Sequence, residues 1–395
     1  MNRRERLLLL LLAALNFTHI LDFMIMMPLG NYLMPAFDVD AGAFAGAVSA
    51  YNYAAFASGI LASFFVDRFD RKSVLLFGYS GFLLGTLFCA LAPSFWLLAL
   101  ARLVAGLFGG LIGAQVLSIV ADSFPYEKRG RAMSWLMTAF SFASVFGIPF
   151  SLYLARFISW HAPFYFIVAT GLVVLPAIWK YVPSMTRHIQ APGQHQTMLQ
   201  TLRVLFAHPQ PRAGMFFSGM LMLGHFLIIP FINPFMEFNV GFSKTQTPVI
   251  YMVGGATTLI SALFWGKLAD RYGKLRIFTI AGFFSALPVL LITQMPAWPF
   301  ALTLLPFAFW FGMTNGRTIA AQSMVSELVP PANRGSFMSF NSSMQQLFTG
   351  VAATIAGLVV SSNAQHQILN YQYLGYLSAG IVLLCLVLAR RLQVQ

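Results

Sequence analysis

The sequence has few charged residues and very few acidic ones. Only 9% of its 395 residues are charged, with 11 Asp or Glu against 24 Lys or Arg. A water-soluble domain carries about 25% charged residues, so this chain cannot cover a surface that faces water on all sides. The shortage of charge excludes a soluble enzyme and a disordered scaffold. Hydrophobic residues fill the chain instead, at 58%, and 40 residues are Phe.

Several motifs that carry chemistry are also missing. The only cysteines, Cys89 and Cys385, lie inside apolar runs, which speaks against a disulfide framework. There is no Gly-x4-Gly-Lys-Ser/Thr phosphate loop and no Cys/His spacing typical of a metal site. The start, Asn2–Arg6, leads into an apolar stretch too long for a cleavable signal peptide. We therefore expect no enzyme activity, no cofactor and no metal, and an energy source in an ion or substrate gradient.

Long apolar runs alternate with short polar loops. A helix needs roughly 20 mainly apolar residues to cross about 30 Å of hydrocarbon. Twelve runs of this kind predict membrane-spanning helices at 7–34, 43–66, 74–92, 95–121, 132–157, 162–182, 212–236, 246–268, 275–295, 297–325, 335–361 and 371–389. The short alternating segments of a membrane β-barrel are absent from the sequence. The expected fold class is an all-α polytopic membrane protein.

One long polar connector, Pro183–Pro211, separates six spans from six. It divides the chain into a predicted N-terminal bundle (1–182) and a C-terminal bundle (212–395). If the N-terminus is cytoplasmic, 20 of the 24 basic residues fall in cytoplasmic loops, and only Arg156 and Lys244 fall in opposite loops. Basic residues concentrate on the cytoplasmic side of membrane proteins. We therefore expect an inner (plasma) membrane protein with both termini and the connector in the cytoplasm.

Three sequence segments recur about 205 residues apart. The pairs are Gly59–Lys72 with Gly266–Lys274 around an Asp-Arg dipeptide, Pro125-x3-Arg129-Gly130 with Pro330-x3-Arg334-Gly335, and His19-x8-Pro28 with His225-x8-Pro234. Their common order and near-constant offset indicate an internal repeat. The two halves are therefore predicted to be parallel repeats with the same topology.

On these residues the chain resembles the major facilitator superfamily over essentially its whole length. Gly266–Lys274 fits that family's loop signature G-x-L-x-D-R-x-G-R/K, whereas the first copy has Ser63 and Asp70 at the two glycine positions. The resemblance implies two six-helix bundles that rock around a central cavity, which the first, fourth, seventh and tenth spans line. It also implies a monomer in the lipid bilayer, with no nucleic-acid partner.

Further residues are similar to one branch of the superfamily. Arg102-x3-Gly106 in the fourth span resembles a membrane-embedded arginine motif, and Gly147-Ile148-Pro149 resembles a reduced antiporter signature. With Leu21-Asp22 and Pro28-Leu29-Gly30, these residues resemble the drug:proton antiporter and sugar-efflux branch. The resemblance implies export of a small molecule in exchange for protons.

The repeated Asp-Arg loops are candidates for a conformational latch. An aspartate where a helix ends can pair with arginines and with the positive end of a neighbouring helix. Such contacts would hold the cytoplasmic face closed and break as the halves rock. The predicted latch residues are Asp67, Arg68, Arg71, Gly266, Asp270, Arg271 and Lys274. The alternative is a solvated loop that is basic only because it is cytoplasmic.

Charges at membrane depth are few: Asp22, Arg102 and Arg317. Each costs at least about 2.5–3.5 kcal/mol on insertion scales, so such residues are candidates for function. Asp22 is the only acid in the middle of a span, and we predict that it carries the coupled proton with Arg102 as its partner. A permanent structural Asp22–Arg102 pair is the alternative.

A second set of residues is predicted to contact substrate. It comprises His19, Tyr51, Asn52, His225, Arg317, Asn341 and Gln345. The fork of donors on Arg317 suits an anionic or hydroxyl-rich group. The histidines occupy equivalent positions in the two halves, and a hydrogen-bonding core role or, with Asp22, a metal site are alternatives for them. The polar residues of the second and eleventh spans could instead bond neighbouring helices.

These features favour a secondary transporter that exports a small organic molecule in exchange for protons. A symporter or facilitator that takes up a sugar or organic anion is the alternative within the same fold. A transporter-shaped receptor without flux is a third possibility, but such a protein needs neither a latch nor an acid within the membrane.

Overall fold

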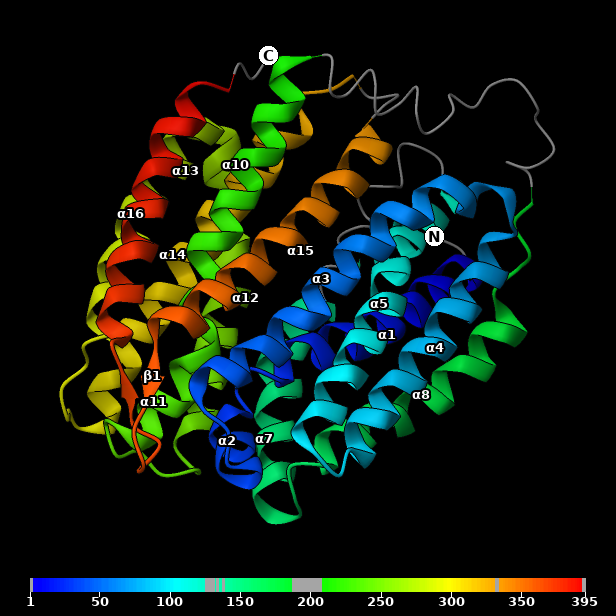
Figure 1. Ribbon diagram of the computed structural model, residues 1–395. Coiled ribbons are helices and arrows are strands. Elements are labelled where there is room, and N and C mark those ends of the chain that lie inside the picture. Colours follow the sequence, from blue (N-terminus) through cyan, green and yellow to red (C-terminus); the bar gives the residue numbers. More distant parts are fainter. Residues whose placement is uncertain are drawn as a thin grey trace.

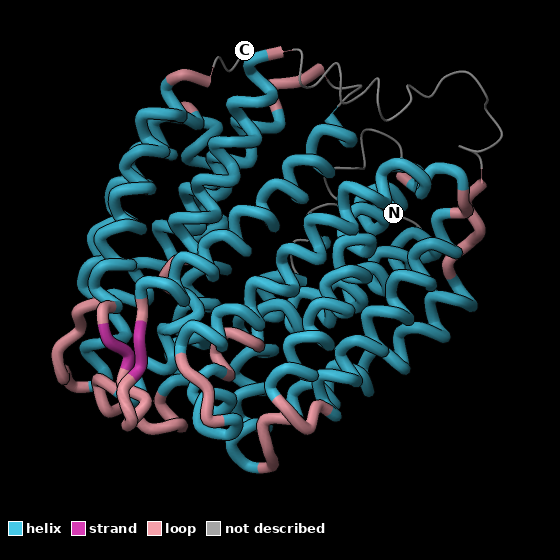
Figure 2. Tube along the Cα trace, in the orientation of Figure 1, coloured by secondary structure: helices cyan, strands magenta, loops and turns pink. Residues whose placement is uncertain are grey.

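The computed structural model describes residues 3–124, 132, 135–136, 139–186, 208–330 and 334–392. Long helices run side by side in two groups, one for each half of the sequence (Figure 1). Figure 2 shows that the loops gather at the two ends of these helices and that strands occur only as one short pair among the described residues. The repeat segment at Pro125–Gly130 and most of the connector lie outside the described residues.

The helices of the N-terminal half are as follows: α1 (Arg3–Ile25), α2 (Gly30–Phe37), α3 (Ala41–Phe65), η1 (Val66–Arg68), α4 (Arg71–Leu91), α5 (Phe95–Ser123), the π-helical turn η2 (Ala143–Gly147), α7 (Ile148–Phe157) and α8 (Ala162–Tyr181). The C-terminal half contains α10 (Pro209–Phe226), η3 (Ile229–Phe231), α11 (Ile232–Phe238), α12 (Thr247–Tyr272), α13 (Lys274–Ile292), α14 (Phe300–Ser326), α15 (Arg334–Val359), the strands β1 (Ser361–Ser362) and β2 (Ile368–Leu369), and α16 (Tyr371–Arg390).

Each range that the sequence predicts to span the membrane contains helix. Within the described residues, nine helices are long and apolar enough to cross a bilayer. The long helices α3, α14 and α15 are not among these nine, and each carries polar residues within the span, such as Asn52, Arg317 and Asn341. The prediction of an all-α polytopic membrane fold is confirmed.

The first and seventh spans differ from the continuous helices that we predicted. Each is broken, α1 ending at Ile25 before Pro28 and α10 ending at Phe226 before Pro230. Proline has no N–H to donate, and its ring clashes with the carbonyl four residues earlier. The breaks therefore fall where the prolines make regular helix unfavourable. They do not fall at equivalent positions, because Ile25 corresponds to Phe231 in the repeat, whereas α10 ends at Phe226.

The two halves meet mainly through α3 with α15, the segment η2–α7 with α12, and α2 with α11. Smaller contacts join α15 to α5 and the strand β1 to α3. In Figure 1, α2, α7 and α11 lie together at the lower end, whereas the upper ends of α3 and α10 diverge on the side of the two termini. The contact between α3 and α15 runs along both helices, from Gly42 beside Gly357 to Gly59 beside Ser343, whereas α2 and α11 meet at the end opposite the termini.

Glycines bring the backbones of the two halves close together. A Cβ on Gly357 of α15 would lie 2.6 Å from Ala45 Cβ and 3.3 Å from Gly42 Cα, both in α3. A Cβ on Gly255 of α12 would lie 2.9 Å from the backbone of Val145 in η2. Small residues permit such close approach of helices in membranes. Glycine is therefore required along both of these contacts.

Candidate transport site

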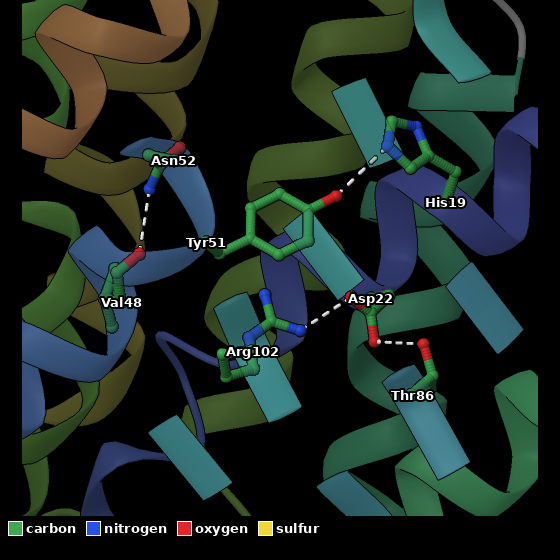
Figure 3. Close-up of polar contacts among 7 residues, drawn as sticks. All are labelled: His19, Asp22, Val48, Tyr51, Asn52, Thr86 and Arg102. Carbon is green, nitrogen blue, oxygen red and sulfur yellow. Dashed lines mark hydrogen bonds and ion pairs between the residues drawn. The ribbon is translucent and has the colours of Figure 1, made fainter. Parts of the chain in front are cut away.

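An ion pair lies inside the N-terminal half (Figure 3). Arg102 Nη1 of α5 donates to Asp22 Oδ2 of α1 at 2.6 Å, and the two side chains are 1% and 0% exposed. Thr86 of α4 donates its hydroxyl to the other carboxylate oxygen at 3.1 Å. Three helices thus supply a carboxylate with both of its oxygens occupied. The two membrane-depth charges that the sequence paired are in direct contact.

Tyr51 of α3 extends this cluster towards His19. Its ring lies over the Arg102 guanidinium, 4.4 Å from the ring centre to Cζ, and its hydroxyl is 3.1 Å from His19 Nε2 (Figure 3). Two glycines of α5 make room, because a Cβ on Gly106 would overlap the Tyr51 carbonyl and one on Gly109 would lie 2.6 Å from the Tyr51 hydroxyl. The arginine motif is therefore a packing motif as well: its glycine lets α3 approach α5.

Asn52 lies apart from this cluster. Its amide donates to the Val48 carbonyl of the same helix at 2.9 Å. Figure 3 shows this contact to the left of the Tyr51 ring, whereas His19 lies to the right of that ring. Gly350 of α15 packs against its Cβ. Asn341 and Gln345 also lie on α15, a helix that packs against α3 and α10. No contact among the described residues joins these three amides to either buried arginine, so their predicted role in substrate binding stays a prediction.

A second arginine lies inside the C-terminal half. Arg317 of α14 is 1% exposed and donates to the Ser285 hydroxyl of α13 at 2.8 Å. Its other terminal nitrogen lies 3.4 Å from His225 Nδ1 of α10. The ring of Trp310 lies 5.3 Å from that of His225. Two of the predicted substrate residues, Arg317 and His225, are thus brought together.

The two arginines differ in charge balance. Arg102 faces Asp22, but no carboxylate of the described residues lies within ion-pair distance of Arg317. Its Nε and the indole nitrogen of Trp310 are buried and have no hydrogen-bond partner in the described part of the chain. No group of three His, Cys, Asp or Glu side chains there could hold a metal ion. The C-terminal half therefore contains a buried positive charge that no acid of the described residues neutralises.

Among the described residues, the second-half loop motif forms its ion pair through Lys274 and not through Asp270 or Arg271. Asp270 and Arg271 are exposed, and Arg271 lies over the Tyr272 ring. Lys274 instead pairs with Glu327 at the end of α14. Gly273, with φ +90°, joins α12 directly to α13, a backbone conformation that favours glycine. The signature glycine is therefore needed for the turn itself.

The first-half copy has a different arrangement. Asp70, which replaces that glycine, accepts hydrogen bonds from the backbone N–H of Met185 at 2.6 Å and from the Ser184 hydroxyl at 2.9 Å. Burial alone would raise the pKa of Asp70, but these bonds and those from Lys72 N–H and Ser73 hold it below its usual value. The side chain of Asp67 lies outside what the structure describes, whereas Arg68 is exposed. Asp70 thus ties the start of α4 to the segment after α8.

Sequence reasoning did not identify Thr86, Ser285 or Trp310 as members of these clusters. Serine and threonine are common in membrane helices, where they usually bond their own backbone, as Thr293 does with the Val289 carbonyl. Nothing in the sequence distinguishes Thr86 from such residues. A tryptophan deep within a span, as at position 310, is a usable signal because its N–H needs an acceptor when buried.

The antiporter-like segment forms a wide turn. In η2 the Ile148 N–H bonds to the Ala143 carbonyl, five residues earlier, and Pro149 follows with no N–H to give. The π-helical turn therefore accommodates Pro149, and the chain stays helical from η2 into α7. It also presents Val145 to Gly255 of the other half.

The family model of the Major Facilitator Superfamily matches residues 12–316 and, again, residues 214–394. The chain belongs to the major facilitator superfamily. It is thus a multi-pass membrane transporter of small molecules and not an enzyme.

Curated relatives cover most of the chain. "Uncharacterized MFS-type transporter YwfA" of Bacillus subtilis (strain 168) is 26% identical over 372 residues, 93% of this chain and 87% of the relative. "Probable sugar efflux transporter" of Helicobacter pylori (strain J99 / ATCC 700824) is 23% identical over 351 residues, 89% and 86% of the two chains. The similarity to both thus extends through both halves.

Solved structures share the fold. The nucleoside transporter NupG matches with a TM-score of 0.75 at 17% identity, over 99% of both chains. The D-xylose-proton symporter matches with a TM-score of 0.76 at 16% identity, over 96% of both chains. At these identities the comparison establishes the architecture alone, which agrees with the two parallel six-helix bundles predicted from the sequence.

Proposed function

We propose that this transporter exports a small organic molecule across the inner membrane in exchange for protons. The observation that carries the proposal is the buried Asp22–Arg102 pair with its bond from Thr86. A carboxylate that can either pair with an arginine or take up a proton has two states with different charge. That competition is what proton-coupled transport requires.

The position of Asp22 connects these two states to the contact between the halves. Asp22 lies three residues before α1 ends at Ile25. The next residue, Phe23, contacts Phe226 of the opposite half, with ring centres 5.7 Å apart. Protonation of Asp22 releases Arg102 to Tyr51 and removes a bond that holds α1 to α5. The step therefore acts on the helix that carries the inter-half contact.

Export is the direction that we favour. With the termini in the cytoplasm, the closed end at α2 and α11 is extracellular, where Asn233 donates to the Pro28 carbonyl at 2.9 Å. The exposed Asp270 at the other end is consistent with a latch that is open to the cytoplasm. Relatives named as sugar efflux transporters support the same direction. Uptake by proton symport, of a sugar or an organic anion, is the second candidate, and the buried Arg317 favours the anion.

Transport by purified protein in liposomes tests the coupling. An imposed pH gradient should drive net flux of radiolabelled sugars or aromatic carboxylates by the wild-type protein. Asp22→Asn should abolish that flux but retain exchange down a substrate gradient, because a neutral amide resembles the protonated acid. Glu237→Gln is the matched control, since Glu237 is a half-buried acid near the closed end, bonded to Thr247. Gradient-driven flux that survives Asp22→Asn and is lost in Glu237→Gln would refute the assignment.

Cysteine labelling tests the proposed orientation. The native cysteines, Cys89 and Cys385, are buried, so single introduced cysteines can be read without removing them. Gln365→Cys, in the loop between β1 and β2, should react with an impermeant maleimide from outside the cell. Arg276→Cys, at the start of α13, should react only after the membrane is opened. The reverse pattern would contradict cytoplasmic termini.

A further inference from the structure

Arg317 is a buried cation that has no counterion among the described residues. A charged group within a membrane protein costs at least about 2.5–3.5 kcal/mol on insertion scales, so it is retained where it meets an opposite charge or a functional need. Arg102 meets Asp22, but no acid of the described residues pairs with Arg317. The aligned position in the first half is Ile112, so the charge is not part of the shared repeat. The missing negative charge must come from elsewhere.

The cluster around Arg317 has more N–H donors than acceptors in the described part of the chain. A guanidinium only donates, so the contact with His225 makes Nδ1 the acceptor and places the imidazole proton on Nε2. Arg317 Nε and Trp310 Nε1 are buried and lack acceptors in the described part of the chain. Ser285 can accept one bond from Arg317 but carries no charge. The cluster therefore has a surplus of N–H groups and a shortage of acceptors.

Aromatic rings surround the same cluster. Phe226 lies 5.2 Å from His225, and Phe311 lies 5.1 Å from Trp310, between ring centres. Phe226 also contacts Phe23 of the N-terminal half. A ligand beside Arg317 would therefore meet apolar surface next to its charged group, and part of that surface continues to the other half of the molecule.

We propose that Arg317, with His225 and Trp310, binds the carboxylate of an organic anion whose body is aromatic or otherwise apolar. The inference rests on the proposed transport function and names its substrate class. The carboxylate supplies the missing charge and acceptor oxygens, and an Arg fork suits a carboxylate in a bidentate manner. A neutral sugar would satisfy the donors but would leave the charge unpaired. An inorganic anion would supply the charge but would leave the aromatic surface unused.

Ligand binding to the purified full-length protein in detergent tests the proposal. The probes are benzoate and 4-phenylbutyrate, each compared with its uncharged amide at the same concentration and with chloride. Both carboxylates should raise the unfolding temperature of the wild-type protein, whereas the amides and chloride should not. Arg317→Gln should weaken carboxylate binding by about tenfold to a hundredfold, the usual loss for a charge-assisted hydrogen bond. Arg317→Lys should retain part of it.

A control and a second measurement complete the test. Arg276→Gln removes an exposed arginine from the same half and should leave binding unchanged. Without ligand, Arg317→Gln should unfold at the same temperature as the wild-type protein or higher, because it removes an unpaired buried charge. Carboxylates that stabilise no more than their amides, or equally in Arg317→Gln, would overturn the proposal, and chloride that replaces them would point to an inorganic anion. Asp22→Asn should keep this binding, so a failure of proton coupling is separable from a failure of the anion site.

Discussion

Replacing Asp22 by Asn and Arg102 by Gln, singly and together, should reveal an interaction energy of about 3 kcal/mol between the two side chains. Two unit charges about 4 Å apart attract by about 4 kcal/mol at an effective dielectric constant of about 20. Removal of one partner from a buried pair costs about 3–5 kcal/mol, because the other charge is left uncompensated. Both side chains are buried and their contact is 2.6 Å, so these values for buried pairs apply.

In the double variant neither side chain is charged, so no buried charge is left without its partner. Its loss of stability should therefore be well below the sum of the two single losses, which is the signature of coupling in a double-mutant cycle. Thr86 can still donate to the amide oxygen of Asp22→Asn in the single and the double variant, so that bond should cancel in the cycle. The free energy of unfolding is measured by titration of the purified protein from mild detergent into dodecyl sulfate, followed by circular dichroism.

Lys274 and Glu327 provide the control cycle. This pair is also an Asp/Glu–Lys/Arg contact, but its side chains are 25% and 28% exposed. Surface pairs contribute about 0–1 kcal/mol, so neutral replacements there (Lys274→Gln and Glu327→Gln) should show little coupling. If the cycle at Asp22 and Arg102 gives no more coupling than the cycle at Lys274 and Glu327, the argument that a buried charge balance holds α1 to α5 is wrong.

Three further outcomes are expected. Gly106→Ala should greatly reduce the yield of folded protein because its Cβ would overlap the Tyr51 carbonyl, whereas Gly113→Ala on the same helix has open space and should not; size-exclusion chromatography distinguishes them. Asp270→Asn should slow substrate exchange in liposomes several-fold and leave carboxylate binding in detergent unchanged, since Asp270 is exposed and lies outside both buried clusters. A loss of carboxylate affinity with a normal exchange rate would contradict the prediction that Asp270 belongs to a conformational latch. Asp70→Ala should lower the unfolding temperature at pH 7, because hydrogen bonds hold the pKa of Asp70 in the folded protein below the unfolded value of about 3.9. The stabilisation by the ionised Asp70 is therefore fully present above about pH 3.9, and it is lost as the pH falls through the folded pKa. The difference from the wild-type protein should therefore narrow in acid, and a constant difference down to about pH 3 would count against it.

The sequence was sufficient for the architecture, because a bilayer requires long apolar helices and the repeat shows that the halves share one topology. It also paired Asp22 with Arg102, since charges within the membrane are few and opposite charges tend to meet. It did not predict where α1 breaks before Pro28 or that a π-helical turn forms at Ala143–Gly147 before Pro149. Both depend on how the residues around each proline pack.

The sequence also could not identify every member of the two polar clusters around Arg102 and Arg317. Whether a hydroxyl bonds its own helix or another is decided by helix rotation, so Ser285 and Thr86 could not be chosen in advance. Asp70 is the instructive case. In the sequence it is a departure from the loop signature, yet in the structure it joins two segments through Met185 and Ser184.

The uncompensated charge on Arg317 makes the membrane voltage relevant to this transporter. Without substrate, Arg317 places a positive charge within the bilayer, and the carboxylate that we propose as ligand would cancel it. Moving one charge through the whole membrane potential is worth about 2.3 kcal/mol per 100 mV. When the protein opens to the other side of the membrane, the electrical potential at Arg317 changes by part of that difference. In the proposed export cycle, a negative cell interior would therefore favour the state of the empty carrier that is open to the cytoplasm, and it would have little effect on the carrier with carboxylate bound. The membrane potential should therefore act mainly on the step in which the empty carrier returns to the state open to the cytoplasm.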